Sequence, residues 1–432
     1  MIQHLRGNPV RRATVLSVLT GIGGQGTVLV SGILVARMLG VEDRGLLALL
    51  AVFPNLCSQI VGLGFPIAVT YQIAATPNQL PTIVKSAMKM FTIQLFVLLV
   101  LHGMIVWLFL RWNPDFQRTT AWVTLLVGPA MLALQYGVAF LQGSEKFQSL
   151  NILRLLLTTP YAVMVLGLYL MEWGNLHRVT IIWVFSTILV GLLALDLVRR
   201  LTNSGQELER PHAQLSQKWM FKFGVKGLIG ATSPMETFRL DQLVAGLVLS
   251  SSALGLYVVG QAFGTLTHLV AQSASIVAYP TVVSRGKGQA GQATMWRFFW
   301  AVTLINGLVT VGLIALVPIL IPLFFGQQFV GAIPVAQILL VGAALAASRR
   351  ILVEGFRGLG KPQVSTIAEI SMYPWLLSGG GILVWQYGLE GLAAAVAIGF
   401  FISLSVAIWF GWSLPKEAII YSPRTGTEDA LP

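Results

Sequence analysis

Three charged residues lie close together inside a long apolar segment, where a charge is costly. Glu236, Arg239 and Asp241 interrupt the run 219–249. A charge near the centre of a membrane costs roughly 2.5–3.5 kcal/mol even on the lenient insertion scale, so such charges are candidates for function. Glu236 and Arg239 are three residues apart and can pair on one helix face, whereas Asp241 needs another partner or water. Pro234 precedes the cluster and should kink or loosen the helix.

The residue types suggest distinct tasks for the cluster. A guanidinium makes paired hydrogen bonds to anionic groups such as phosphate, so we expect Arg239 to contact an anionic ligand. Glu236 or Asp241 then becomes an ion-coupling or gating carboxylate. The alternative is a network of salt bridges that holds helices together. Glu369, eight residues after Lys361, is the next candidate for a charge inside a cavity.

A basic cluster near a predicted helix end forms a second candidate site. Arg349, Arg350 and Arg357 accompany Glu354 there. Anchoring by lipid headgroups is the favoured interpretation. The alternative is that these arginines bind a phosphate group of the substrate at the inner mouth of a cavity.

The composition requires a membrane around these residues. Of 432 residues, 55% are hydrophobic and 10% are charged, whereas soluble domains carry about 25% charged residues. The net charge of +12 is spread over short loops, which favours anionic lipid rather than nucleic acid as the partner. The single cysteine, Cys57, excludes an intrachain disulfide. The first apolar run is too long for a signal peptide.

About twelve apolar runs are long enough to cross a bilayer. Counted by side of the membrane, 22 of the 28 Lys and Arg lie at or near the ends of the runs on the side that holds both termini, five lie on the other side, and Arg239 lies well within a run. This bias predicts cytoplasmic termini and an even number of spans. The predicted spans are 13–39, 45–72, 86–110, 119–142, 151–171, 178–198, 219–249, 253–282, 296–325, 330–355, 363–387 and 390–412.

Two pairs of similar sequence segments indicate that the chain consists of two similar halves. LVARMLGVEDRGLLALLAVF begins at Leu34 and LVAGLVLSSSALGLYVVGQAF at Leu243, each with a Gly-Leu pair after a short turn. LQGSEKF and FRGLGKP follow the fourth span of each half. Parallel repeats of this kind recur in transporters, with the substrate site at the repeat interface. We expect a bundle at 1–199, a cytoplasmic linker at 200–218, a second bundle at 219–412 and a tail at 413–432.

The first outer turn has an ordinary structural explanation. Gly40 suits a positive φ just past a helix end. Glu42 and Asp43 suit the first turn of the next helix. A membrane glycosyltransferase is the weaker alternative, because no large external loop accompanies these acids. The chain has no P-loop, zinc spacing or nucleophile-base signature, so we expect no enzyme and no ATP-driven pump within it.

Three segments resemble a known family. The stretch from Leu34 to Val69 resembles the opening of polysaccharide flippases of the O-antigen and exopolysaccharide type, with Arg44 where an aromatic residue is usual. FRLDQLVAGLVLSSSALGLYVVGQAF resembles the seventh and eighth spans of that family, and EGFRGLGKPQVST its turn between the tenth and eleventh spans.

The resemblance implies an all-α membrane fold of about twelve helices, in two six-helix bundles around a central cavity. It also implies the superfamily that holds multidrug extruders and lipid II flippases. The expected function is flipping of a pyrophosphate-linked oligosaccharide across the cytoplasmic membrane, with Arg239 at the pyrophosphate. A drug or metabolite antiporter and a membrane polysaccharide polymerase or ligase are the alternatives. No cofactor is expected, and coupling to H⁺, Na⁺ or the membrane potential is left open, as is association with polysaccharide assembly proteins.

Overall fold

The computed structural model describes residues 9–76, 79–114, 116–203, 219–225, 235, 237–286, 288–361 and 363–413. Every regular element among these residues is a helix. The first half contains α1 (Pro9–Gly62), α2 (Phe65–Ala75), α3 (Leu80–Trp112), α4 (Arg118–Val123), η3 (Thr124–Leu126), α5 (Val127–Gly143), α6 (Phe147–Leu170) and α7 (Leu176–Asn203). The second half contains α9 (Leu240–Val244), η4 (Ala245–Leu249), α10 (Ser251–Ser284), α11 (Gln289–Phe325), η5 (Gln327–Phe329), α12 (Ala332–Gly358), α13 (Gln363–Ile370), α14 (Met372–Trp375), η6 (Leu376–Gly380) and α15 (Gly381–Trp412).

The structure confirms, for much of the chain, that its helices are long and apolar enough to span a membrane. Eight of the described helices are long and apolar enough to cross a bilayer. Two of them contain a glycine with positive φ, Gly40 in α1 and Gly388 in α15, and each glycine separates two predicted spans. The positive φ predicted for Gly40 is therefore confirmed. Large apolar side chains such as Leu377 and Trp385 are exposed on the helices, as expected where lipid is the solvent. The count of twelve spans stays a prediction.

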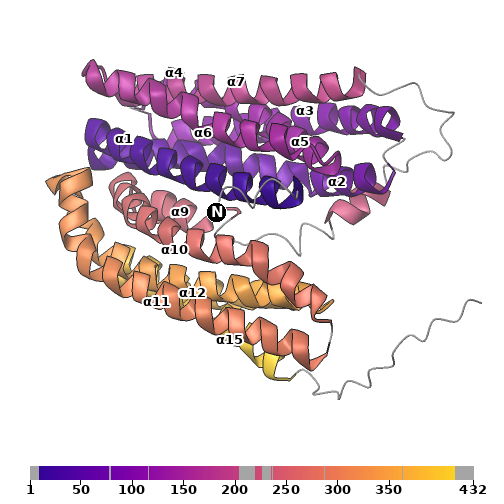
Figure 1. Ribbon diagram of the computed structural model, residues 1–432. Helices are drawn as coiled ribbons and strands as arrows, with labels where there is room; N and C mark the ends of the chain where they lie inside the picture. The colour runs from indigo at the N-terminus through magenta and orange to yellow at the C-terminus, as the bar shows by residue number, and fades with distance from the viewer. Residues whose placement is uncertain are drawn as a thin grey trace, which may run out of the picture.

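The helices form two halves. Figure 1 shows α1 to α7 in one layer and α9 to α15 in the other. Each half has an apolar core of its own, one around Phe65 and Tyr136 and one around Phe299 and Phe356. The short helix at 219–225 packs its Met220 into the core of the first half. Most of the predicted linker lies outside the described residues, so the domain boundaries stay a prediction.

The two halves approach each other most closely where α1 crosses α10. A Cβ atom added to Gly45 would lie 1.7 Å from the carbonyl oxygen of Ser251, and one added to Gly255 would lie 2.0 Å from that of Val41. Neither distance is compatible with a real side chain, so only glycine fits at either position. These are the two glycines of the repeated Gly-Leu pairs, and the repeat thus places them at the contact between the halves.

Side chains reinforce this contact. Arg37 on α1 donates from Nε to the carbonyl oxygen of Phe324 at 2.6 Å, and from Nη2 to that of Leu323. It thereby caps the C-terminal end of α11, where a cation is favourable. Apolar side chains of both halves pack together nearby, including Phe53 and Leu254.

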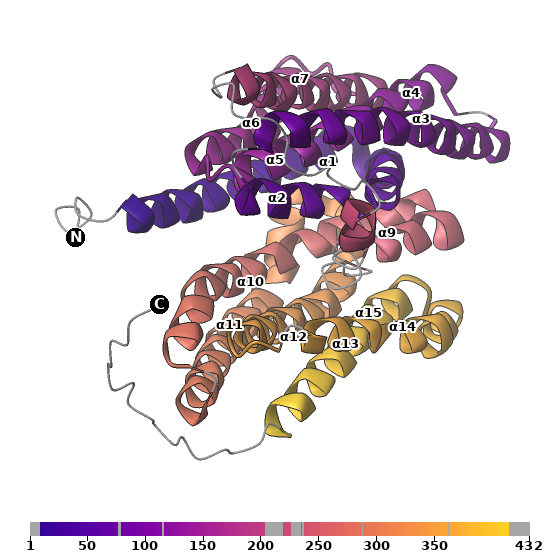
Figure 2. The ribbon, with the colours of Figure 1, turned by 90° about the vertical axis from the view of Figure 1, so that its right-hand side faces the viewer.

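These contacts gather at the end of the molecule that the charge bias predicts to be outer. Away from this end α10 slopes away from α1 and the halves diverge (Figure 2). The conformation is therefore closed at the predicted outer end.

Replacing Gly255 with alanine should loosen this closed end, because the new Cβ would overlap the carbonyl oxygen of Val41. We expect a cost of about 1–3 kcal/mol to the closed arrangement. The measurement places a cysteine at Thr265, which lines the cavity between the halves, in a Cys57→Ala background. A membrane-impermeant maleimide added from the predicted outer side should label Gly255→Ala faster than the parent. The matched control is Gly312→Ala on α11, where an added Cβ meets nothing within 4 Å. Equal labelling of both variants would contradict the expectation.

Candidate functional site

A cavity of about 490 Å³ lies between the two halves. Pockets of this size are typical of binding sites for small molecules or for part of a larger ligand. Its lining comes from α1, the segment before α9, and α9, α10, α11, α12 and α15, so both halves contribute. The polar and charged residues that line it are Gln25, Arg44, Arg239, Asp241, Gln242, Gln261, Thr265, His268, Gln272 and Arg350.

The cavity lining is cationic. Arg44, Arg239 and Arg350 contribute three guanidinium groups, and Asp241 contributes the one carboxylate among the described residues of the lining. None of the three arginines forms an ion pair with another described residue. Such an arrangement favours an anionic ligand, because guanidinium groups left without a counter-ion bind phosphate or carboxylate strongly.

Arg239 lies at a break in the chain rather than inside a continuous helix. Its φ of 50° is in the left-handed region, and α9 begins at the next residue. The side chain is exposed and reaches Gln242 at 3.4 Å. The preceding turn is held by the first half, since Asn55 donates to the carbonyl oxygen of Thr237 at 3.1 Å. The predicted span 219–249 is therefore interrupted at Arg239, directly before α9.

Glu236 of the predicted cluster, and Pro234 before it, lie outside the described residues. The predicted pairing of Glu236 with Arg239 therefore stays a prediction. The same holds for a kink caused by Pro234.

Asp241 is buried at the edge of the cavity and is held by its neighbours. Its Oδ2 accepts hydrogen bonds from the Tyr257 hydroxyl at 2.9 Å and from Gln261 Nε2 at 3.1 Å. Gln242 donates in turn to Gln261. The Oδ1 atom is also buried and has no hydrogen-bond partner among the described residues. Asp241 thus finds its partners on α10, in line with the expectation that it needs a partner other than Arg239.

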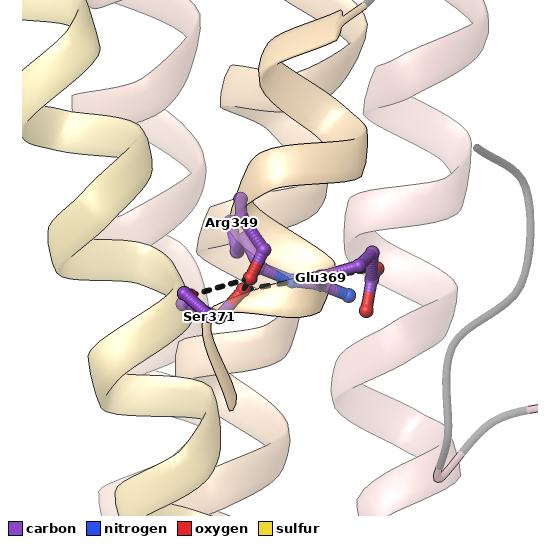
Figure 3. Close-up of polar contacts among 5 residues, drawn as sticks. Arg349, Glu369 and Ser371 are labelled. Atoms are coloured by element: carbon purple, nitrogen blue, oxygen red, sulfur yellow. Dashed lines mark hydrogen bonds and ion pairs between the residues drawn. The ribbon is translucent and has the colours of Figure 1, made fainter. Parts of the chain in front are cut away.

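Glu369 and Arg349 form an ion pair within the second half. The guanidinium of Arg349 on α12 donates to Glu369 on α13 and lies 3.4 Å from the hydroxyl of Ser403 on α15. The two side chains are only 5% and 12% exposed, and Arg349 also lies over the ring of Phe400. Figure 3 shows the pair beside Ser371, at the break between α13 and α14. The pair thus joins three helices where one of them is interrupted.

This geometry corrects two expectations. Glu369 is absent from the described lining of the cavity, because its carboxylate is turned to Arg349. Arg349 is buried and is not available at an inner mouth. Arg357 is partly exposed and pairs with Glu354 at 2.8 Å. Of the three arginines predicted for the mouth, Arg350 is the one that lines the cavity.

Arg44 lines the cavity, although the sequence places it at the end of the first predicted outer turn. Its Nε atom is buried and has no hydrogen-bond partner among the described residues. A buried donor without a partner costs about 1–3 kcal/mol, so water or a ligand is expected to satisfy it. The signal was present in the sequence, since Arg44 stands where the resembled family usually has an aromatic residue.

Breaking the Arg349–Glu369 pair should destabilise the protein strongly, because each single change leaves one charge buried and uncompensated. We expect Arg349→Met or Glu369→Gln to lower the free energy of unfolding by about 3–5 kcal/mol, and the double variant to cost less than the sum. Unfolding in detergent measures this. The matched control is the more exposed pair, where Arg357→Met or Glu354→Gln should cost at most about 1 kcal/mol. Equal losses at both pairs would show that burial does not strengthen the first.

The fold has clear structural relatives at low sequence identity. The lipid II flippase MurJ, in an inward closed conformation, matches with a TM-score of 0.70 and 13% identity, over 93% of this chain and 88% of MurJ. A multidrug resistance MATE family transporter of the MOP superfamily, inward-facing, matches at 0.62 and 15%, over 92% of this chain and 97% of the transporter. A mutant of the Vibrio cholerae MATE transporter VcmN matches at 0.61 and 14%, over 93% and 94%.

The sequence itself assigns the family. No curated protein matches the chain. Residues 10–285 match the family described as polysaccharide biosynthesis protein. Because this match covers more than half of the sequence, the chain belongs to the polysaccharide biosynthesis protein family.

Proposed function

We propose that the protein moves a lipid-linked oligosaccharide, joined to its lipid through pyrophosphate, across the cytoplasmic membrane for cell-surface polysaccharide synthesis. The observation that carries this proposal is the set of three arginines that line a cavity between two helical halves and form no ion pair with another described residue. Membership of the polysaccharide biosynthesis family supports it, as does the likeness of the fold to a lipid II flippase.

The cavity chemistry suits a phosphorylated sugar. Arg44, Arg239 and Arg350 supply planar donors for the pyrophosphate oxygens. The buried Nε of Arg44 gains an acceptor that no described residue provides. The amide side chains of Gln25 and Gln272 can donate to and accept from sugar hydroxyls. The lipid tail stays in the bilayer while the charged head crosses through the cavity.

Alternating access supplies the movement. The closed outer end, with Gly45 against Gly255, faces one side of the membrane. Release on that side requires the halves to separate there and to close at the other end. If the termini are cytoplasmic, as the charge bias predicts, the anionic head moves outward. A membrane potential that is negative inside favours this direction by about 2.3 kcal/mol per charge for each 100 mV. The potential can therefore act as a driving force beside, or in place of, a coupling ion.

The alternatives fit the cavity less well. A drug or metabolite antiporter on the same fold is expected to have a more acidic cavity, whereas three arginines and one aspartate line this one within the described residues. A polymerase or ligase requires a large external loop. The predicted outer connections between α3 and α4 and between α6 and α7 are short. Association with polysaccharide assembly proteins has no further support, and membrane lipids are the partners that the fold requires.

Replacing any of the cavity arginines, Arg44, Arg239 or Arg350, with glutamine should slow transport. Each change removes charge-assisted hydrogen bonds worth about 1.5–3 kcal/mol, which corresponds to roughly tenfold to hundredfold. The measurement is the appearance of a pyrophosphate-linked glycan in the opposite leaflet of proteoliposomes. The matched control is Arg357→Gln, which removes an arginine that pairs with Glu354 outside the cavity and should leave the rate unchanged.

The same variants can be tested in cells. Deletion of the gene should cause lipid-linked glycans to accumulate on the inner side of the membrane, and the Arg239→Ala copy should rescue poorly. No accumulation after deletion would contradict the proposed function. Full rescue by every arginine variant would instead leave the function intact and remove these residues from the transport path.

A further inference from the structure

A second hollow lies outside the central cavity, at the connection between α10 and α11. It encloses about 380 Å³. Its lining joins the end of α10 to the first three turns of α11. The residues that line it are Thr281, Arg285, Ala290, Ala293, Thr294, Arg297 and Phe298.

The charge of this hollow is uncompensated. Arg285 and Arg297 are both exposed, and neither forms an ion pair or a side-chain hydrogen bond with another described residue. No acidic side chain belongs to the described lining. The turn between the two helices thus places two guanidinium groups in the lining of one hollow. Two such groups favour an anion, and a phosphate group suits the fork geometry of arginine.

The hollow does not belong to the transport cavity. Gln272 is the last residue of α10 that lines the cavity, and Thr281 lies nine residues further along the same helix. Nine residues correspond to about two and a half turns, so the two side chains leave α10 on opposite sides. The two sites therefore occupy different faces of the helix.

The surface around the hollow is apolar and outward-facing. Val283 on α10 and Trp300 and Leu304 on α11 are 48%, 61% and 66% exposed. Large apolar side chains with this exposure mark the surface that lipid covers. The arginines lie at the end of the helices that the charge bias predicts to be cytoplasmic, where anionic lipid headgroups are concentrated. The occupant thus needs an anionic head at the arginines and apolar chains along the helices.

We propose that this hollow binds the headgroup phosphate of an anionic membrane phospholipid. Arg285 and Arg297 hold the phosphate, and the acyl chains lie along the outer faces of α10 and α11. Bound lipid would brace the inner end of α10, the helix that also lines the cavity and meets the first half at Gly255. The assignment does not depend on which substrate crosses the cavity.

The test measures lipid binding by the purified full-length protein. Native mass spectrometry in detergent, with phosphatidylglycerol or phosphatidylcholine added, counts retained lipids, and thermal unfolding records the stabilisation that each lipid produces. We expect phosphatidylglycerol to bind in preference to phosphatidylcholine. The variant Arg285→Gln/Arg297→Gln should weaken that binding roughly thirtyfold, since each basic residue near an anionic membrane surface contributes about a fivefold gain in binding.

The matched control removes two cations from the same predicted side of the membrane. Lys85 and Lys89 lie one turn apart on α3, are exposed, and line neither hollow. Lys85→Gln/Lys89→Gln should therefore keep the preference for phosphatidylglycerol. All four positions are exposed, so the variants should fold, and unchanged size-exclusion profiles check this.

Three results would overturn the proposal. Equal loss of binding in the lysine variant would show general attraction of anionic lipid to a basic surface. Equal binding of phosphatidylcholine would show that the headgroup charge is not recognised. Stabilisation by inorganic phosphate or pyrophosphate alone, with no added effect of phosphatidylglycerol, would assign the arginines to a soluble anion.

Discussion

A charge inside a membrane must be paired, lie at the boundary with water, or line a wet cavity, and this constraint organises the structure. Arg349 and Glu369 follow the first route and join three helices of one half. Arg44, Arg239 and Arg350 follow the third and remain without counter-ions among the described residues. The pair contributes to the fold itself. The unpaired cations instead carry a free-energy cost that an anionic ligand removes, and this difference separates the structural charges from the candidate binding charges.

The placement of strong contacts relative to the two halves also follows a pattern. The Arg349–Glu369 pair lies within one half, so it can persist when the halves move against each other. The contacts between the halves at the outer end combine close backbone approach, with Gly45 against Gly255 and Arg37 on the carbonyl groups that end α11, with apolar packing around Phe53 and Leu254. Separating the halves there breaks this packing but leaves intact the core that each half has of its own. Each half can thus keep its core while the contact between the halves opens, as alternating access requires.

Much of the fold could be predicted because lipid imposes simple rules on length and polarity. A helix must be long and apolar to cross, and Gly40 marked a division within α1. The seventh predicted span was less predictable at Arg239, where the chain takes a left-handed conformation before α9. The turn there is held by Asn55, which bonds to the carbonyl oxygen of Thr237 from the other half of the chain. Such a contact depends on how segments far apart in the sequence pack together, and the hydropathy of the sequence does not indicate it.

Depth in the membrane could be estimated from the sequence, but the direction of a side chain around its helix could not. Arg349 and Arg350 are neighbours on α12 and were expected to act together. Successive residues of an α-helix point about 100° apart, because one turn holds 3.6 residues. That rotation turns Arg349 toward α13 and α15, where Glu369 and Ser403 satisfy it, and turns Arg350 toward the cavity. The packing of α12 against its neighbours therefore decides which arginine stabilises the fold and which is left for an anionic ligand.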